Sequence, residues 1–492
     1  MKIFVANRGE IALRIMRTCR EMGLETVAVY SSGEEGALHV RYAGEAVSIG
    51  DAQNYLNLGV MLEAIRRSGA QAVHPGYGFL SENADFAQAV ERAGLAFIGP
   101  TPKVIARMGD KIAARRIARH VGLPVLPGPD APLPRETPLE IMQDMRFPVL
   151  VKAAAGGGGR GIRVVRSRDE LPWMADAARE EALAAFGDDT LYVEPLVRQA
   201  RHIEVQILGD GQGQVIALGE RDCSVQRRHQ KVIEESPAPN LPEAMREMLA
   251  GWAVRIGQAM RYRSLGTVEF LVSPRGQAYF IEVNPRIQVE HGVTEMVTGL
   301  DLVKAQLQLA LDGHLPFDGN SVWPRGVAIE ARVLAEDPED GFLPDSGEIR
   351  FVREPAGPGV RVDSALYPGA FVSPSFDPLL AKVIAWGSSR DEALARLRRA
   401  LEEFRIAGVH TNIDFLQRIL ESSSFRKGRC DVTFLDGFQA SGRGRCTASE
   451  KRAALAVALL AAQSRAQDAG LVRDESNLWR RTAWGEQIRT PD

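Results

Sequence analysis

The stretch PVLVKAAAGGGGRGIRVVRS, residues 148–167, holds the glycine pattern on which the choice of fold depends. Gly156, Gly158 and Gly161 match the spacing of a dinucleotide-binding fingerprint, which requires a strand before the loop and a helix after it. Here β-branched residues also follow the glycines, so the sequence predicts a strand on both sides. We therefore expect a β-hairpin tip whose backbone N–H groups close over phosphate oxygens. This favours a nucleotide other than NAD, and a hairpin tip without a ligand stays open as the alternative.

The surrounding sequence indicates several domains. Strand and helix patterns alternate over residues 1–100, which is typical of a parallel, doubly wound sheet. A helix is expected over 102–121, and a proline-rich connector follows at 123–138. Strands and helices then mix up to about residue 312, and residues 327–386 are rich in β patterns.

Composition excludes some classes of protein. The chain has 492 residues and a formal net charge of −3, so a basic nucleic-acid surface is not expected. Its four cysteines are scattered without a C-x-x-C pair, which favours free thiols in a reducing compartment. No stretch predicts a signal peptide or a membrane span, so we expect a cytoplasmic protein.

The stretch GTVEFLVSPRGQAYFIEVNPRIQVEH, residues 266–291, predicts two strands joined by a turn. A turn centred on residues 275–276 places Glu269 opposite Glu282 and Thr267 opposite Asn284. Two carboxylates about 5 Å apart repel by roughly 3 kcal/mol, so we expect a cation between them. Oxygen ligands favour Mg²⁺ or Mn²⁺ over zinc, and a solvated acidic sheet face is the alternative.

Two further stretches suggest anion binding. In RIQVEH, an extended backbone projects Arg286, Gln288 and Glu290 to one side, as a clamp and a base for a small oxyanion. A polar edge strand would explain the same pattern. The basic run at 220–235, ERDCSVQRRHQKVIEE, predicts either a solvated loop or an anion-binding loop.

Together these stretches resemble biotin carboxylase, the ATP-grasp component of acyl-CoA and pyruvate carboxylases. VANRGEIALRI, HPGYGFLSEN, MGDK and TEMVTGLDLVKAQL add to the likeness, which runs from residue 1 to about 437. The resemblance implies an α/β and α+β fold in four parts: a doubly wound pre-ATP-grasp domain at 1–102, an ATP-grasp domain at 103–326 with a mobile glycine-rich lid at about 124–194, a β-rich C-terminal domain at 327–437, and a helical docking or linker tail at 438–492.

The resemblance also implies a reaction. ATP phosphorylates bicarbonate to carboxyphosphate, which releases CO₂ to N1 of biotin. ATP is expected at Lys111, Lys152, Gly158, Gly159, Glu194, Val197, His202, Gln226, His229, Glu269 and Glu282. Two Mg²⁺ or Mn²⁺ ions are expected at Glu269, Glu282 and Asn284, bicarbonate at Lys231, Arg286, Gln288 and the Val289 backbone, and biotin at Arg332 and Tyr77. The catalytic set implied is Arg286, Glu290, Lys231 and Arg332, with Glu290 as the base.

The partners follow from what the chain lacks. It has no A/V-M-K-M motif for attaching biotin, so biotin is expected in trans, on a carrier protein or domain, together with a carboxyltransferase subunit. A homodimer is implied at Arg17, Glu21 and Arg361, although Pro358 replaces an aromatic residue. Acetyl-CoA carboxylase in fatty acid biosynthesis is one expected setting.

Departures from the pattern keep other functions open. Ala155 replaces a glycine, Pro195 replaces a lysine after Glu194, and Gly292 replaces a proline after His291, which we expect to loosen the loop beside the clamp. A carbamoyl-phosphate-type synthetase and a non-catalytic nucleotide-binding subunit therefore remain as alternatives.

Overall fold

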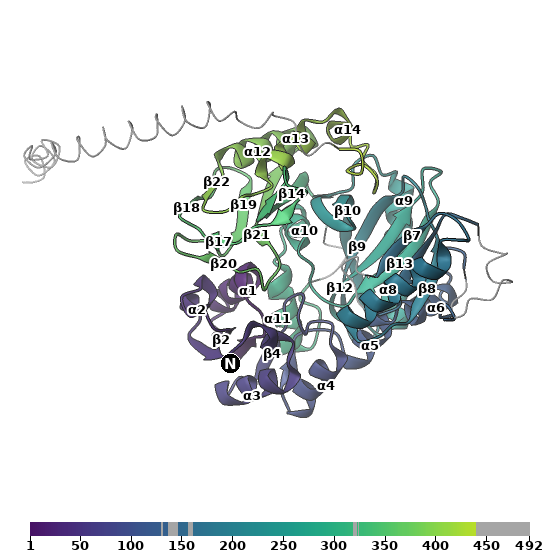
Figure 1. Ribbon diagram of the computed structural model, residues 1–492. Helices are drawn as coiled ribbons and strands as arrows, with labels where there is room; N and C mark the ends of the chain where they lie inside the picture. Colours follow the sequence, from purple (N-terminus) through teal and green to yellow (C-terminus); the bar gives the residue numbers. More distant parts are fainter. Residues whose placement is uncertain (129–130, 136–145, 156–160, 318–321, 323, 439–492) are drawn as a thin grey trace, which may run out of the picture. The chain divides into compact units, whose positions relative to one another are not determined.

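The structure, a computed structural model, describes residues 1–128, 131–135, 146–155, 161–317, 322 and 324–438 (Figure 1). The expected tail at 438–492 therefore lies outside the described residues except for Phe438. Residues 1–438 form one compact unit.

The N-terminal part is a parallel sheet with strand order β3-β2-β1-β4-β5, as the alternating pattern predicts. Its strands are β1 (Lys2–Val5), β2 (Glu25–Tyr30), β3 (Glu45–Ser48), β4 (Ala72–His74) and β5 (Ala96–Phe97). Its helical segments are α1 (Gly9–Glu21), α2 (Leu38–Tyr42), η1 (Ala52–Leu56), α3 (Leu58–Ser68) and α4 (Ala84–Arg92). Strands β1, β2 and β4 are mostly apolar and buried, as expected where helices cover both faces of such a sheet, whereas β3 lies at the edge and is largely exposed.

The helix expected over 102–121 is confirmed over most of its length, but it is interrupted at Asp110. The chain forms α5 (Pro102–Gly109) and α6 (Lys111–His120), with Asp110 between them. The Asp110 carboxylate accepts hydrogen bonds from the N–H groups of Ile112 and Ala113, so it caps a new helix. This break places Lys111 at the first position of α6.

The glycine stretch joins two antiparallel strands, which confirms the predicted hairpin. A three-stranded sheet has the order β7-β6-β8, with β6 (Val149–Ala153) paired to β7 (Ile162–Val165) and to β8 (Leu191–Pro195). Helix α8 (Leu171–Phe186) packs against it and shares a separate apolar core with it. The loop glycines 158 and 159 lie outside the described residues.

An eight-stranded antiparallel sheet forms the centre of the unit, in the order β13-β12-β9-β10-β11-β14-β21-β19 (Figure 1). Its strands are β9 (Arg201–Asp210), β10 (Val215–Arg227), β11 (Gln230–Ser236), β12 (Arg263–Val272), β13 (Ala278–Asn284), β14 (Val327–Leu334), β19 (Val360–Ser364) and β21 (Leu379–Gly387). The expected domain boundary at residue 327 falls at the start of β14, which pairs with β11. One continuous sheet therefore crosses that boundary.

The basic run at 220–235 is not a loop, so both loop interpretations are wrong. It forms the end of β10 and most of β11, joined by a tight turn at Arg228 and His229. Because the run crosses the middle of the sheet, Arg221 is completely buried.

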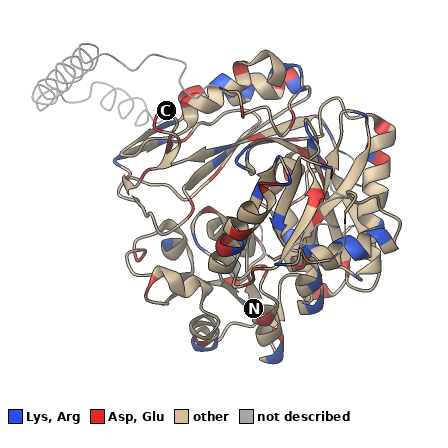
Figure 2. Ribbon diagram, turned by 45° about the vertical axis from the view of Figure 1, so that its right-hand side comes forward, with Lys and Arg blue, Asp and Glu red and all other residues tan. Residues whose placement is uncertain are grey.

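The remaining elements cover the sheet and complete the C-terminal part. The helices are α9 (Glu243–Ala259), α10 (His291–Thr298), α11 (Leu302–Asp312), α12 (Arg390–Glu403), α13 (Ile413–Glu421) and α14 (Ser423–Arg426). The short strands are β15 (Glu336–Asp337), β16 (Leu343–Pro344), β17 (Gly347–Glu348), β18 (Phe351–Arg353), β20 (Phe371–Val372) and β22 (Arg405–Ala407). Figure 2 shows basic and acidic residues intermixed over the described residues. Among the described residues, none of the helices has the length and apolar character needed to cross a membrane.

Candidate active site

The hairpin of β12 and β13 brings two acidic residues together in the predicted register. Glu269 pairs with Glu282, and Thr267 pairs with Asn284. The turn, however, is centred on Arg275 and not between Arg275 and Gly276, because Val272 pairs with Ala278. A β-bulge between Glu269 and Phe270 restores the register at the acidic pair. The expected alignment is therefore correct, although the strand reaches it through a bulge that the sequence pattern does not reveal.

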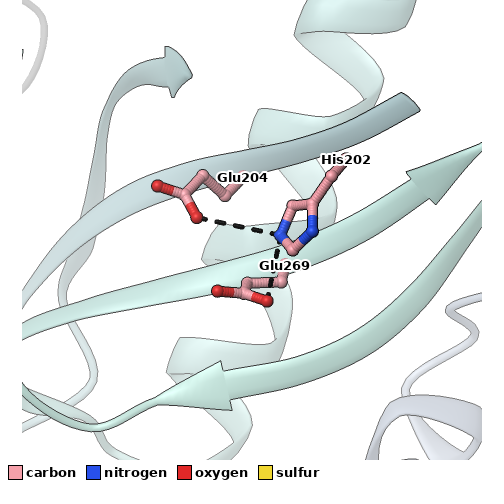
Figure 3. A group of neighbouring side chains, drawn as sticks. All are labelled: His202, Glu204 and Glu269. Carbon is pink, nitrogen blue, oxygen red and sulfur yellow. Dashed lines mark ion pairs between the residues drawn. The ribbon is translucent and has the colours of Figure 1, made fainter. Parts of the chain in front are cut away.

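Charged residues form a row across four neighbouring strands. Arg221 on β10 pairs with Glu204 on β9, Glu204 pairs with Glu269, and Glu269 pairs with Glu282 on β13. Residues directly opposite each other share one face of a sheet, so this row lines a single surface. Figure 3 shows Glu204 and Glu269 directed at the ring of His202, whose Nε2 lies 3.0 Å from Glu269 Oε2 and 3.9 Å from Glu204 Oε2.

Lys231 is the central cation of the site. Its Nζ donates to Glu204 Oε2 at 2.6 Å, Glu269 Oε1 at 2.9 Å and Glu290 Oε1 at 2.7 Å. Burial opposes its charge, but these three carboxylates raise the pKa of Lys231 well above its usual value. Lys231 therefore remains protonated and joins the acidic strand pair to the segment after β13.

That segment, residues 286–290, carries the expected clamp residues, but its backbone bends at Arg286 and turns at Val289 and Glu290, so the expected extended conformation is wrong. Gln288 donates to Glu269 Oε1 at 3.1 Å and accepts from Arg221 Nη2 at 2.7 Å. Arg286 is paired with Glu82 and donates to the Ile287 carbonyl at 3.2 Å. Contacts with Glu82, Glu269 and Lys231, and not a strand alternation, therefore set the positions of Arg286, Gln288 and Glu290.

Glu290 lies between two cations. Lys231 donates to one of its oxygens, and Arg332 Nη2 lies 3.0 Å from the other. Burial opposes ionisation, but Lys231 and Arg332 hold the pKa of Glu290 below its usual range. Arg332 also donates from Nε to Glu234 Oε1 at 2.6 Å, so one guanidinium joins two buried carboxylates.

The residues expected to bind the nucleotide come from two places: Lys111 lies beside the β12–β13 hairpin, and Lys152 and Glu194 lie on the three-stranded sheet. Lys111 Nζ is 3.4 Å from Glu282 Oε2, and its backbone N–H donates to the Ala154 carbonyl beside the glycine stretch. Lys152 on β6 pairs with Glu194 on β8, and Arg115 Nη1 lies 3.4 Å from the other Glu194 oxygen. Lys111 thus links Glu282 to the chain just after β6.

The other expected nucleotide positions are more dispersed. Val197 is half-buried after β8, Gln226 is buried near the end of β10, and His229 is exposed in the turn between β10 and β11. Pro195 is the last residue of β8, where it pairs with Val149.

The acidic pair has the donor chemistry that a divalent cation requires. Glu269, Glu282 and Asn284 supply carboxylate and amide oxygens from one face. In this structure Glu269 Oε1 accepts from Lys231 and, at 2.8 Å, from Asn284 Nδ2, while Lys111 lies near Glu282. Positive side chains thus already balance these carboxylates, and the oxygens fit Mg²⁺ or Mn²⁺.

Tyr77, expected near biotin, belongs to a second buried network. Its hydroxyl donates to Glu10 Oε1, and Lys382 Nζ lies 3.2 Å from the same oxygen. Lys382 also donates to the Val289 carbonyl at 2.9 Å. This network connects the expected biotin side to the clamp.

The sequence analysis missed Glu204, Lys382 and Glu10, and it noted Arg221 only as part of the basic run at 220–235. A signal for Glu204 exists in HIEVQ, where His202, Glu204 and Gln206 alternate with apolar residues. Lys382 stands out as one lysine in the apolar run LLAKVIAWG. Burial of such residues is rare unless they are paired, so their patterns carry a detectable signal.

The structure shows the surroundings of the Gly292 departure and of the residues expected at a homodimer surface. Gly292 lies in the first turn of α10 and is buried, so the expected loosened loop is wrong. Arg361 is paired with Glu295 and Asp363 at 2.6 and 2.7 Å, which occupies its guanidinium within the chain. Arg17 and Glu21 lie on α1.

Three family profiles cover most of the chain. They are "Biotin carboxylase, N-terminal domain" at residues 1–105, "Carbamoyl-phosphate synthase L chain, ATP binding domain" at 110–317 and "Biotin carboxylase C-terminal domain" at 330–437. Among curated relatives, biotin carboxylase of Pseudomonas aeruginosa is 48% identical over 440 residues, which cover 88% of this chain and 98% of that protein. Human mitochondrial pyruvate carboxylase is 48% identical over 444 residues, which cover 88% of this chain and 38% of that protein.

Solved structures agree with these matches. The biotin carboxylase–β,γ-ATP complex from Campylobacter jejuni aligns with a TM-score of 0.86 at 41% identity, covering 88% of this chain and 98% of that one. The biotin carboxylase domain dimer of the Hydrogenobacter thermophilus 2-oxoglutarate carboxylase, which holds MgADP, ADP and bicarbonate, aligns with a TM-score of 0.86 at 43% identity, covering 88% of this chain and 97% of that one.

Proposed function

The chain belongs to the biotin carboxylase family and is an ATP-dependent carboxylase of the ligase class, and we propose that it carboxylates biotin presented by a separate carrier. The observation that carries this proposal is the position of Lys231, which contacts Glu269 and Glu290 at once. A cation in that position joins the side expected to bind ATP to the residue expected to act on bicarbonate.

Bicarbonate is proposed to bind beside Lys231, Arg286, Gln288 and the Val289 N–H, with Glu290 as the base. A carboxylate held between Lys231 and Arg332 is a weak base. An anion that draws these cations toward itself raises the proton affinity of Glu290, because nearby positive charge is what stabilises its ionised form. Substrate binding therefore activates the base.

ATP is proposed to lie between the three-stranded sheet and the β12–β13 hairpin. Lys111 and Lys152 would contact its phosphates, Glu194 and Val197 its adenine, and His202, Gln226 and His229 other parts of the nucleotide. Glycines 158 and 159 would belong to a lid over the phosphates. Divalent cations bound by Glu269, Glu282 and Asn284 would neutralise charge on the phosphates.

Biotin is proposed to approach Arg332 and Tyr77. Deprotonated biotin carries negative charge on its ureido oxygen, and Arg332 supplies a fixed cation for it. The four parts of the chain keep their expected bounds in this proposal: 1–102, 103–326 with the lid at 124–194, 327–437 and 438–492.

The chain is proposed to act in the cytoplasm as a homodimer, with a biotin carboxyl carrier protein and a carboxyltransferase subunit. The final acceptor is proposed to be an acyl-CoA such as acetyl-CoA, which would place the chain in fatty acid synthesis. Identification of the subunits that co-purify with the natural complex tests this choice, and a pyruvate-specific carboxyltransferase would contradict it.

The reaction is tested by ATP hydrolysis with Mg²⁺, bicarbonate and free biotin. We expect hydrolysis to require bicarbonate, to rise with free biotin and to yield carboxybiotin. The ATP-binding profile, named for carbamoyl-phosphate synthase, favours one second candidate. Stimulation by ammonia instead of biotin would support that candidate and overturn ours, and turnover at background would indicate a non-catalytic subunit.

The role of Arg332 is tested by Arg332→Lys, which keeps a charge beside Glu290 but removes the guanidinium fork. We expect biotin carboxylation to fall about 100-fold, while bicarbonate-dependent ATP hydrolysis stays within about threefold. Arg246→Lys is the matched control, because Arg246 pairs with Glu220 outside the site and should alter neither rate. An equal loss of both activities in Arg332→Lys would show that biotin is not its target.

A further inference from the structure

The peptide group between Gln288 and Val289 is held from one side by His291. His291 Nδ1 lies 2.7 Å from the Gln288 carbonyl oxygen, and the His291 backbone N–H donates to the same oxygen at 3.3 Å. A carbonyl only accepts hydrogen bonds, so Nδ1 must carry the hydrogen. Because a trans peptide directs its C=O and N–H in opposite directions, the Val289 N–H points away from His291.

The Val289 N–H is available to a ligand. No oxygen in the described part of the chain accepts a hydrogen bond from it. Val289 itself is half-buried, between the buried side chains of Gln288 and Glu290. An unpaired backbone donor at such a position is costly unless a ligand or water satisfies it.

His291 is completely buried and neutral. Burial, and then the positive charges of Lys382, Arg14 and Arg361, lower its pKa well below the usual value. Its Nε2 finds no donor among the described residues and lies 3.8 Å from a Glu295 oxygen. The ring is therefore expected in one neutral tautomer, with the hydrogen on Nδ1.

The next peptide group is held by a buried cation. Lys382 Nζ donates to the Val289 carbonyl at 2.9 Å and is itself neutralised by Glu10 and Asp363, whose oxygens lie at 3.2 and 3.5 Å. Two consecutive peptide groups of the clamp are thus fixed by side chains that bicarbonate itself is not expected to touch.

We propose that His291 is a positioning residue, which aims the Val289 N–H at bicarbonate by holding the Gln288 carbonyl. This role rests on the proposed function, in which that N–H binds bicarbonate. Lys382 acts beside His291 by holding the following peptide group. The ring acts through the backbone, so its loss should weaken bicarbonate binding more than it slows turnover.

The test compares His291→Leu with His291→Asn. Leu and Asn share the same branched side-chain skeleton, but the Asn amide N–H₂ sits near the position of Nδ1 and can still donate. We expect His291→Leu to raise the KM for bicarbonate about 10- to 100-fold, the effect of a lost hydrogen bond to a charged ligand, with the KM for ATP within about threefold. His291→Asn should stay within about fivefold of wild type in both constants.

His314→Leu is the matched control, because His314 makes a similar Nδ1 contact, at 3.0 Å to the Asp312 carbonyl, on the surface. It should change neither constant. A wild-type chain without bicarbonate-dependent ATP hydrolysis would overturn the proposed function. An active wild type with an unchanged bicarbonate KM in His291→Leu, or an equal rise in both KM values, would overturn the positioning role alone.

A second measurement uses the unmodified chain and covers the case in which His291→Leu fails to fold. Nitrogen-15 NMR of labelled histidine, with His291→Asn for assignment, reports which ring nitrogen carries the hydrogen. We expect the neutral Nδ1–H form of His291 throughout the neutral pH range. A neutral Nε2–H form, or a protonated ring near pH 7, would contradict the proposed contact.

Discussion

At the scale of single residues, the site depends on how buried charges are paired. Lys231, Glu290 and Arg332 all have close partners of opposite charge. Glu330 on β14 differs: neither of its carboxylate oxygens has a hydrogen-bond partner among the described residues, and it is completely buried. Burial raises its pKa well above the usual value, although Lys382 and Arg332 oppose the shift and Glu234 and Glu290 add to it.

This predicts a pH dependence of stability that Glu330→Gln removes. The folded state holds a proton on Glu330 that the unfolded state releases above its ordinary pKa near 4.3, so stability is lost as pH rises past that value. Each unit of the shift corresponds to about 1.4 kcal/mol. Relative to wild type, Glu330→Gln should therefore be more stable at about pH 8 than at about pH 5 in denaturant unfolding.

Glu247→Gln, on an exposed position of α9, is the control for this experiment and should show the same difference from wild type at both pH values. An equal difference from wild type at both pH values for Glu330→Gln would mean that Glu330 is ionised when folded.

At the scale of elements, the packing of α10 on the central sheet depends on a glycine. A Cβ at Gly292 would lie 2.3 Å from Ile384 Cδ1 on β21 and 3.3 Å from Glu330 Oε2. Ile384 is completely buried, so its Cδ1 can move aside only by disturbing the packing around it. The same helix begins with His291, so this close approach also determines where the clamp lies.

We expect Gly292→Ala to destabilise the protein by about 1–3 kcal/mol through overpacking. Gly251→Ala is the matched control: Gly251 is an exposed glycine inside α9 with no atom within 4 Å of an added Cβ. Its replacement should stabilise the protein by roughly 0.5–1 kcal/mol. Denaturant unfolding measures both changes, and a neutral Gly292→Ala would show that α10 can shift away from the sheet.

At the scale of the whole molecule, the eight-stranded sheet joins parts that the sequence divides at residue 327. Strands β11 and β14 pair from Ile233↔Ala331 to Ser236↔Ala328, so the expected ATP-binding and C-terminal parts share a ladder. The three-stranded sheet of β6, β7 and β8 instead has its own apolar core. The strands of the large sheet should therefore unfold together as one cooperative unit, and the small sheet should unfold as a separate unit.

Native-state hydrogen exchange tests this division. Amides of β9, β12, β14 and β21 are expected to lose protection in one cooperative opening, whereas those of β6, β7 and β8 should open at lower free energy. The parallel sheet around β1 serves as an internal reference. Opening of β14 and β21 before β9 and β12 would contradict a shared unit.

Much of the fold and the site was predictable, because the signals are local. The strands around the glycine stretch and the pairing of Glu269 with Glu282 follow from periodicity and turn chemistry. The helix break at Asp110, the burial of 220–235 and the setting of Gly292 were not predicted, because each depends on a neighbour distant in sequence or on a cap that the periodicity masks.

The sequence by itself determined which strands and helices form and which residue types can bind ATP, a divalent cation and a small anion. Only the tertiary structure decided that Lys231 reaches Glu204, Glu269 and Glu290 together, and that His291 and Lys382 hold the clamp from behind. The physical reason is that local pattern reports which face a side chain occupies. Its charge partners, by contrast, come from strands brought together by the β9–β12 and β10–β11–β14–β21 pairings.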